Sequence, residues 1–293
     1  MKIALFAKST DKQTTDCLEI LLKNLQTTHQ LFIEKKFLDS LSNKNTNIVI
    51  QQTTLSFKTL DESFDLLISL GGDGTILRAV SLIKDLKIPI VGINTGRLGF
   101  LATIQPNDLN EALKKIVDSD FKISERTLIT VSTSCNHPKI ENNSFAFNEI
   151  AVSRKNTTSM ININTKLNDE FLNSYWADGL IIATPTGSTG YSLSCGGPVI
   201  SPDTSTFVIT PIAPHNLNAR PIIISDDTEI KLKVDGRESE FLMSLDSRII
   251  TLKNTSEITI KKASFKIKMI ELNNESFIST LRKKLLWGKD KRN

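Results

Sequence analysis

The 293-residue chain has few of the residues that mark specialised protein classes. Its three cysteines, Cys17, Cys135 and Cys195, are too few for a disulfide framework, and no two of them have metal-ligand spacing. No apolar run approaches the roughly 18 residues of a membrane span. The first run, Ile3 to Ala7, is short enough for a buried strand and too short for a signal peptide. These absences predict a cytoplasmic protein with no membrane partner.

The surplus of charge is small. Lys and Arg number 36 against 32 Asp and Glu, a formal net charge of +4. A surplus of this size does not predict a nucleic-acid partner, although it is compatible with a small anionic ligand. With 39% hydrophobic and 23% charged residues, neither a disordered chain nor a coiled coil fits. At roughly 150 residues per domain, the length predicts about two domains.

Two common phosphate-binding motifs are missing. The chain contains no G-x-x-x-x-G-K-[ST] sequence, which excludes a P-loop nucleotide hydrolase. It also contains no G-x-G-x-x-G sequence, so the usual dinucleotide fingerprint is absent. A nucleotide bound by this chain must therefore contact a different loop.

The first part of the chain alternates short apolar runs with helical periodicity. Residues 3–7, 64–70 and 88–93 read as buried strands, and Leu109 to Val117 has the spacing of an amphipathic helix. Strands that alternate with helices indicate a mostly parallel sheet with helices on its faces. The sequence thus predicts an α/β domain over residues 1–122.

The pattern changes after Phe121. Short β-branched segments, such as 145–152 and 160–167, replace the long helical patterns and predict a β-rich, sandwich-like domain over residues 123–270. Apolar spacing returns near Phe277 to Leu285 and predicts a helical tail over residues 271–293, ending at Trp287-Gly288. Arg282, Lys283 and Lys284 are expected to form a solvated face of this tail helix.

The strongest local signal is the run Leu70-Gly71-Gly72-Asp73-Gly74-Thr75, where a buried strand ends and a helix begins. Glycines let the backbone approach a ligand closely, and N–H groups at the start of a helix attract phosphate. The loop would lie at the carboxyl end of a strand, where open α/β sheets bind ligands. The alternative is a tight strand-to-helix turn capped by Asp73.

Two further segments carry polar chemistry. The segment from Asp178 to Pro198 is dense in hydroxyls and glycines, carries one tyrosine and has no charged residue between Leu180 and Cys195. Such a segment suits a nucleotide pocket, although Ser/Thr/Gly-rich stretches can also be plain loops. The pair Asn148-Glu149 lies in an apolar strand and could hold a ribose diol, or it could be a strand end that faces water.

Together, GGDGT at 71–75, FNE at 147–149 and DGLIIATPTGSTGYSLSCGGP at 178–198 resemble the ATP:NAD 2′-phosphotransferases, the NAD kinases. The resemblance covers most of the chain. GGDGT alone is shared with diacylglycerol and sphingosine kinases, whereas the long second segment is specific. Trp176, Gly190 and Cys195 depart from the usual family residues.

The resemblance implies a role for each matching residue. Asp73 would be the catalytic proton acceptor for the adenosine 2′-hydroxyl, and Gly71, Gly72 and Thr75 would form the phosphate loop. The residues implied for NAD binding are Asp73, Gly74, Arg78, Asn148, Glu149, Asp178, Thr189, Gly190, Tyr191, Ser192, Leu193, Ser194 and Arg248. The family also implies that a neighbouring subunit completes the NAD site, hence a homodimer or homotetramer.

The expected reaction is transfer of the γ-phosphate of ATP to NAD, which gives NADP. Mg²⁺ is expected as a cofactor from the chemistry of ATP. The sequence shows no metal cage of protein side chains. Two alternatives stay open: a lipid kinase that shares the GGDGT loop, and a non-catalytic module that senses NAD or NADP.

Overall fold

The computed structural model describes residues 1–43, 55–135, 137–156, 159–216, 218–273 and 276–287. The chain divides into two compact units. Unit 1 comprises Met1–Glu125 and Ile267–Asn293, and unit 2 comprises Arg126–Lys266. Residues from the predicted helical tail therefore cluster with the N-terminal part of the chain. None of the helices in the described part of the chain has the length and apolar character that a membrane crossing requires.

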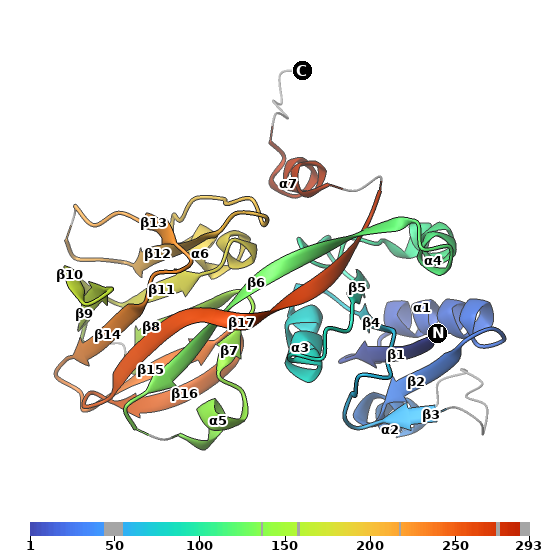
Figure 1. Cartoon of the computed structure of the whole chain (residues 1–293), viewed down its shortest axis with the longest axis horizontal. Coiled ribbons are helices and arrows are strands. Elements are labelled where there is room, and N and C mark those ends of the chain that lie inside the picture. Colours follow the sequence, from blue (N-terminus) through green and yellow to red (C-terminus); the bar gives the residue numbers. More distant parts are fainter. Residues whose placement is uncertain (44–54, 136, 157–158, 217, 274–275, 288–293) are drawn as a thin grey trace. The chain divides into compact units, whose positions relative to one another are not determined.

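Unit 1 is an α/β layer structure (Figure 1). Its elements are β1 (Lys2–Ala7), α1 (Lys12–Leu25), β2 (Gln30–Glu34), α2 (Lys35–Asn43), β3 (Leu55–Phe57), β4 (Leu66–Leu70), α3 (Asp73–Ile83), β5 (Ile90–Ile93), a 3₁₀ turn (Pro106–Asp108), α4 (Leu109–Val117) and α7 (Phe277–Leu285). The strands run parallel in the order β3-β2-β1-β4-β5. This confirms the predicted α/β fold with a mostly parallel sheet.

The core of unit 1 follows from the apolar spacing of the sequence. Helix α1 buries Cys17, Leu18 and Leu21 against the sheet, and α4 buries Leu113 and Ile116 in the same cluster. Strand β4 is buried along its whole length, as a central strand covered on both faces must be. The carboxyl ends of β4 and β5 are neighbours in this sheet, so the loops that follow them lie side by side.

Unit 2 is a β-sandwich. Its elements are α5 (Pro138–Asn142), β7 (Phe145–Ala146), β8 (Glu149–Arg154), β9 (Ile161–Leu167), β10 (Glu170–Ala177), β11 (Gly179–Ala183), a 3₁₀ turn (Thr186–Thr189), α6 (Tyr191–Ser194), β12 (Thr206–Ile212), β13 (Ile222–Ser225), β14 (Ile230–Asp235), β15 (Glu240–Leu245) and β16 (Arg248–Lys253). The long strands β6 (Phe121–Thr133) and β17 (Glu257–Leu272) each contain a boundary between the units.

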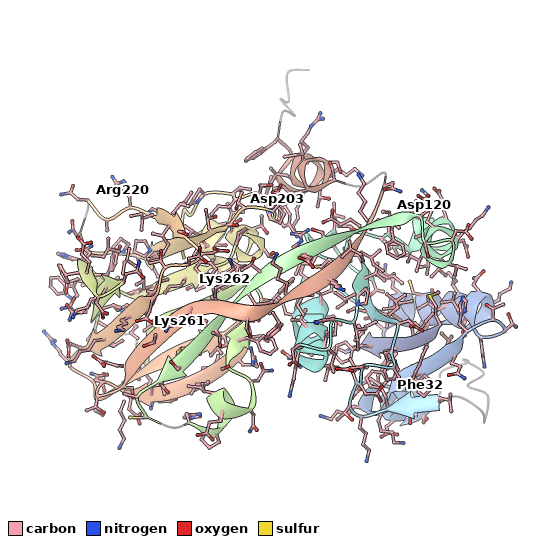
Figure 2. All side chains as sticks on the ribbon, viewed as in Figure 1. Phe32, Asp120, Asp203, Arg220, Lys261 and Lys262 are labelled. Carbon is pink, nitrogen blue, oxygen red and sulfur yellow. The ribbon has the colours of Figure 1, made fainter. Side chains whose placement is uncertain are left out.

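Two sets of antiparallel strands build the sandwich. One has the order β13-β12-β11-β8-β15-β16, and the other runs β10-β9-β14-β17. Side chains from both sets, such as Ile150 and Leu180 on one side and Ile163 and Leu232 on the other, form one buried cluster. At the periphery, Lys262 (Figure 2) forms an ion pair of 2.8 Å with the buried Asp226. The β-rich character predicted from the sequence is thus confirmed.

The C-terminal helix differs from its expected form at two points. It ends at Leu285, before the predicted Trp287-Gly288, because Leu286 adopts a left-handed backbone conformation at φ 56°. Arg282 and Lys283 are exposed as predicted. Lys284 is also exposed, but its Nζ donates a hydrogen bond of 2.8 Å to the Leu98 carbonyl, so it is not a merely solvated side chain. Before the helix, the Asn273 side-chain amide donates a hydrogen bond of 2.5 Å to Asp120 Oδ1; Asp120 is labelled in Figure 2.

Candidate functional site

The Asp73 carboxylate in unit 1 is held by backbone amides. Its Oδ2 accepts a hydrogen bond of 2.8 Å from the Phe100 N–H, and its Oδ1 accepts bonds of 3.0 and 3.1 Å from the N–H groups of Leu101 and Ala102. Asp73 is the first residue of α3, whose N-cap is Gly72. The carboxylate therefore does not cap its own helix, which was the alternative interpretation of this loop. It is fixed instead by the loop that follows β5.

Two glycines make this arrangement possible. Gly71 has a φ of +146°, a conformation that side chains disfavour, and a Cβ there would lie 2.2 Å from Thr75 Oγ1. A Cβ on Gly99 would lie 1.9 Å from Asp73 Oδ1, well inside van der Waals contact. The glycine at 99 thus lets the backbone that precedes the three donating amides approach the carboxylate.

Asn94 shapes the loop that holds Asp73. This side chain is fully buried at the end of β5, and its amide nitrogen donates to the carbonyls of Arg97 and Ala102 at 2.7 and 3.3 Å. Its Oδ1 accepts the Gly96 N–H at 2.8 Å. We did not predict a role for residues 94–102. The signal in the sequence was an Asn-Thr-Gly turn directly after a buried strand, next to the strand that ends at the GGDGT loop.

In unit 2, a half-buried aspartate, Asp246, shapes the Asn148-Glu149 segment. Asp246 accepts hydrogen bonds from the N–H groups of Phe147, Asn148 and Glu149 at 3.0, 2.8 and 3.2 Å. These bonds replace strand pairing, which explains why the single strand predicted for 145–152 is split into β7 and β8. Because of this break, Asn148 lies between the two strands and Glu149 is the first residue of β8.

Both side chains of this pair carry buried oxygens without a donor. Asn148 Oδ1 and Glu149 Oε2 are inaccessible to solvent and have no hydrogen-bond partner among the described residues. Leaving such acceptors unpaired costs free energy, so a ligand that supplied the donors would be favoured at this position. A pair of neighbouring hydroxyl groups has the required chemistry.

The charge state of Glu149 is set by its surroundings. Burial and the nearby Asp246 carboxylate raise the pKa of Glu149 to about 8, against the opposing effect of the nearby Tyr191 backbone N–H. Burial also raises the pKa of Asp246, while its three amide donors and Arg248 act in the opposite direction. Two carboxyl groups thus share one buried environment, and Glu149 ionises near pH 8.

The 184–191 segment packs directly against Asn148 and Glu149. The Thr184 hydroxyl donates to the Phe147 carbonyl at 2.7 Å, and the Thr184 N–H donates to the Asn148 carbonyl at 2.9 Å. A Cβ on Gly187 would lie 2.0 Å from the Asn148 carbonyl oxygen. A Cβ on Gly190 would lie 3.1 Å from Glu149 Oε2, so the glycine lets the backbone pack closely against the unpaired oxygen. The glycine-rich segment is therefore a fitted partner of the Asn-Glu pair and not a plain loop.

Other residues predicted to bind NAD fall into two groups. Gly74, Arg78, Tyr191 and Ser194 are exposed, and Thr189 and Leu193 are half-buried. Four more make contacts within unit 2. Asp178 forms an ion pair with Arg154 at 2.9 Å, and the buried Ser192 Oγ lies 2.8 Å from Thr210 Oγ1. Gly190 donates its N–H to the Gly187 carbonyl, and Arg248 donates to the carbonyls of Asn143 and Phe145.

Arg248 therefore braces the chain at the start of β7, and its binding of NAD stays a prediction. Ser192 is likewise placed to fix α6 against β12, since its hydroxyl is buried. No group of three or more His, Cys, Asp or Glu side chains could hold a metal ion within the described ranges.

Comparison with known proteins gives matches over nearly the whole chain. The ATP-NAD kinase N-terminal domain matches residues 3–121, and the ATP-NAD kinase C-terminal domain matches residues 147–272. The NAD kinase of Flavobacterium psychrophilum is 54% identical over the full length of both chains, and that of Christiangramia forsetii is 53% identical, also over the full length of both.

Solved structures agree in fold. An NAD kinase from Archaeoglobus fulgidus in complex with ATP has a TM-score of 0.71 and 27% identity, and the match covers 97% of each chain. Yeast NADH kinase complexed with NADH has a TM-score of 0.85 at 23% identity, over 99% of this chain and 88% of the yeast chain. Since both domain matches follow in order along one chain and the bacterial relatives align from end to end, this chain belongs to the ATP-NAD kinase family.

Proposed function

We propose that the chain is an NAD kinase that transfers the γ-phosphate of ATP to the 2′-hydroxyl of the adenosine ribose of NAD, giving NADP and ADP. The observation that carries this assignment is the pair of buried, unpaired acceptors Asn148 Oδ1 and Glu149 Oε2. A ribose diol supplies the two hydroxyl donors that these oxygens lack. Curated NAD kinases that are 50–54% identical over their full length support the same reaction.

Asp73 would accept the proton of the attacking hydroxyl. In the transfer step, the 2′-oxygen bonds to the γ-phosphorus, the bond to the β,γ-bridging oxygen breaks, and ADP leaves. The hydroxyl proton moves to an oxygen of the Asp73 carboxylate. A carboxylate is a weak base at neutral pH, so this proton moves late, as the new P–O bond forms. The three amide donors keep the carboxylate in one orientation, which favours in-line attack.

Mg²⁺ is part of this proposal as a companion of ATP. Magnesium commonly retains several waters and binds through one or two carboxylates plus substrate phosphates. The described residues offer no cluster of three ligating side chains but include Asp73, so they fit a metal carried by the phosphates and not a protein cage. When bound, the ion neutralises charge on the phosphoryl oxygens.

Replacing Asp73 tests the assignment. Asp73→Asn keeps the size of the side chain but cannot take up the proton, and we expect turnover to fall by about 10²- to 10⁴-fold while the affinity for NAD changes little. The assay couples NADP formation to an NADP-specific dehydrogenase, with ATP and Mg²⁺ supplied. Near-wild-type turnover in a folded variant would remove Asp73 from this role. A wild-type protein that binds NAD without turnover would instead indicate a sensing module.

We also expect a homodimer or homotetramer in which a neighbouring subunit completes the NAD site, as the family resemblance implies. Mixing Asp73→Asn with Tyr191→Ala protein should then restore some activity, because some sites would receive both intact residues. Sedimentation that shows an active monomer at the assay concentration would refute this expectation.

A further inference from the structure

Helix α7 contacts the loop that fixes the Asp73 carboxylate, although about 180 residues separate the two in sequence. Lys284 Nζ donates to the Leu98 carbonyl at 2.8 Å and lies 4.9 Å from the centre of the Phe100 ring. The same ring lies 6.4 Å from that of Phe277, at the start of the helix. All of these residues belong to unit 1.

Phe100 connects the helix to the carboxylate. Its ring contacts α7, while its own N–H donates to Asp73 Oδ2 at 2.8 Å. We call residues Leu98–Ala102 the carboxylate-holding segment. Leu98 and Phe100 of this segment contact α7. Phe100, Leu101 and Ala102 donate their N–H groups to Asp73. A displacement of Phe100 would move both sets of contacts together.

The helix is itself fixed at its beginning and in its middle. Ser276 and Ser279 form a reciprocal capping box, in which each side chain accepts the N–H of the other residue. Thr280 and Leu281 are buried, which docks the helix against unit 1. The last turn of the helix, which carries Lys284, is therefore held in place. The neighbouring Lys283 is exposed and forms no ion pair or hydrogen bond within the described part of the chain.

We propose that α7 positions the catalytic carboxylate, with Lys284 and Phe277 acting through the carboxylate-holding segment as positioning residues. This inference rests on the proposed role of Asp73 as proton acceptor. The charged Lys284 donor and its contact with the Phe100 ring restrict Leu98 and Phe100. Because Lys284 is exposed, these contacts affect the local order of the segment more than the stability of the whole chain.

Three variants separate positioning from a general effect of charge. Lys284→Met removes the donor and the cation, Lys284→Arg keeps both, and Lys283→Met removes a neighbouring cation that does not contact the segment. We expect Lys284→Met to lower kcat by about 3- to 10-fold with little change in KM for NAD, since orientation and not binding is lost. Lys284→Arg should restore most of kcat, and Lys283→Met should match the wild type. Phe277→Leu should act in the same direction as Lys284→Met.

Hydrogen–deuterium exchange gives a readout that does not depend on the reaction. In Lys284→Met, the peptide that contains the amides of residues 100–102 should exchange about 3- to 10-fold faster than in Lys283→Met, because those amides lose protection when the segment loosens. Equal exchange and equal kcat in the two variants would overturn the proposal, as would faster exchange with unchanged kcat. If the wild type transferred no phosphate to NAD, the proposed function would fail, whereas faster exchange would still show that α7 orders the segment.

Discussion

Replacing Glu149 by Gln should stabilise the protein at alkaline pH. Below pH 4.5, Glu149 is protonated in both the folded and the unfolded chain, so its ionisation has no effect on stability. Between pH 4.5 and about 8, the unfolded chain loses the proton and the folded chain retains it. The contribution of Glu149 to the free energy of unfolding therefore falls as pH rises through this window and is constant above it.

The size of the effect follows from the environment of the carboxyl. The difference between the ordinary pKa of 4.5 and the raised pKa of about 8 corresponds to about 5 kcal/mol, at about 1.36 kcal/mol per pKa unit. Burial dominates, so solvent screening removes little of this energy. The amide of Gln has no ionisation, and its variant avoids the loss. We expect Glu149→Gln to match the wild type within about 1 kcal/mol at pH 5 and to exceed it by about 3 to 5 kcal/mol at pH 9.

Urea unfolding at pH 5, 7 and 9 measures this difference. The chain has two tryptophans, and Trp287→Phe leaves Trp176, in β10, to report on unit 2. Glu238→Gln, at an exposed position, is the matched control and should show no pH-dependent gain. A Glu149→Gln gain that is equal at pH 5 and pH 9 would refute the reasoning, because it would not come from ionisation.

The same substitution should weaken the binding of NAD. At pH 8.5, where Glu149 is mostly ionised, the charged acceptor is lost, and a hydrogen bond to a charged group is worth roughly 1.5–3 kcal/mol. We expect KM for NAD to rise about tenfold or more with little change in KM for ATP. When a protein is less stable with its native residue than with an uncharged analogue, that residue is typically retained for function. If KM for ATP alone changed, Glu149 would act on the other substrate.

Elements that depend on local apolar spacing could be predicted from the sequence. Residues 3–7 lie within β1, and residues 109–117 form α4 with the predicted bounds. The GGDGT loop could be placed between a buried strand and a helix for the same reason. In each case the spacing of apolar residues indicates the element, because burial of its apolar face stabilises it.

The partners that hold the site residues could not be predicted in this way. Asp73 is fixed by N–H groups of residues 27–29 positions later, and every non-proline residue has such a group, so no side-chain pattern marks them. Asp246 acts on Phe147, 99 positions away. Contacts of this kind are set by sheet topology, whereas periodicity reports local structure alone.

The remaining predictions concern glycines whose missing side chains leave space for the site. Gly99→Ala should lower kcat by about 10-fold or more, since its Cβ would lie 1.9 Å from Asp73 Oδ1 and must displace the carboxylate; an unchanged kcat would show that the carboxylate can relocate without loss. Gly187→Ala should destabilise unit 2 by about 1–3 kcal/mol in urea unfolding, because the new Cβ would meet the Asn148 carbonyl oxygen at 2.0 Å and backbone cannot yield as a side chain can. Gly190→Ala is the matched comparison: its nearest contact is Glu149 Oε2 at 3.1 Å, which a shift of a few tenths of an ångström relieves. We expect it to leave stability within about 1 kcal/mol of the wild type and to act instead on KM for NAD, since the added methyl group would displace the unpaired oxygen. Equal destabilisation by the two alanines would refute this distinction, because a small shift of Glu149 Oε2 would then not relieve the contact at Gly190.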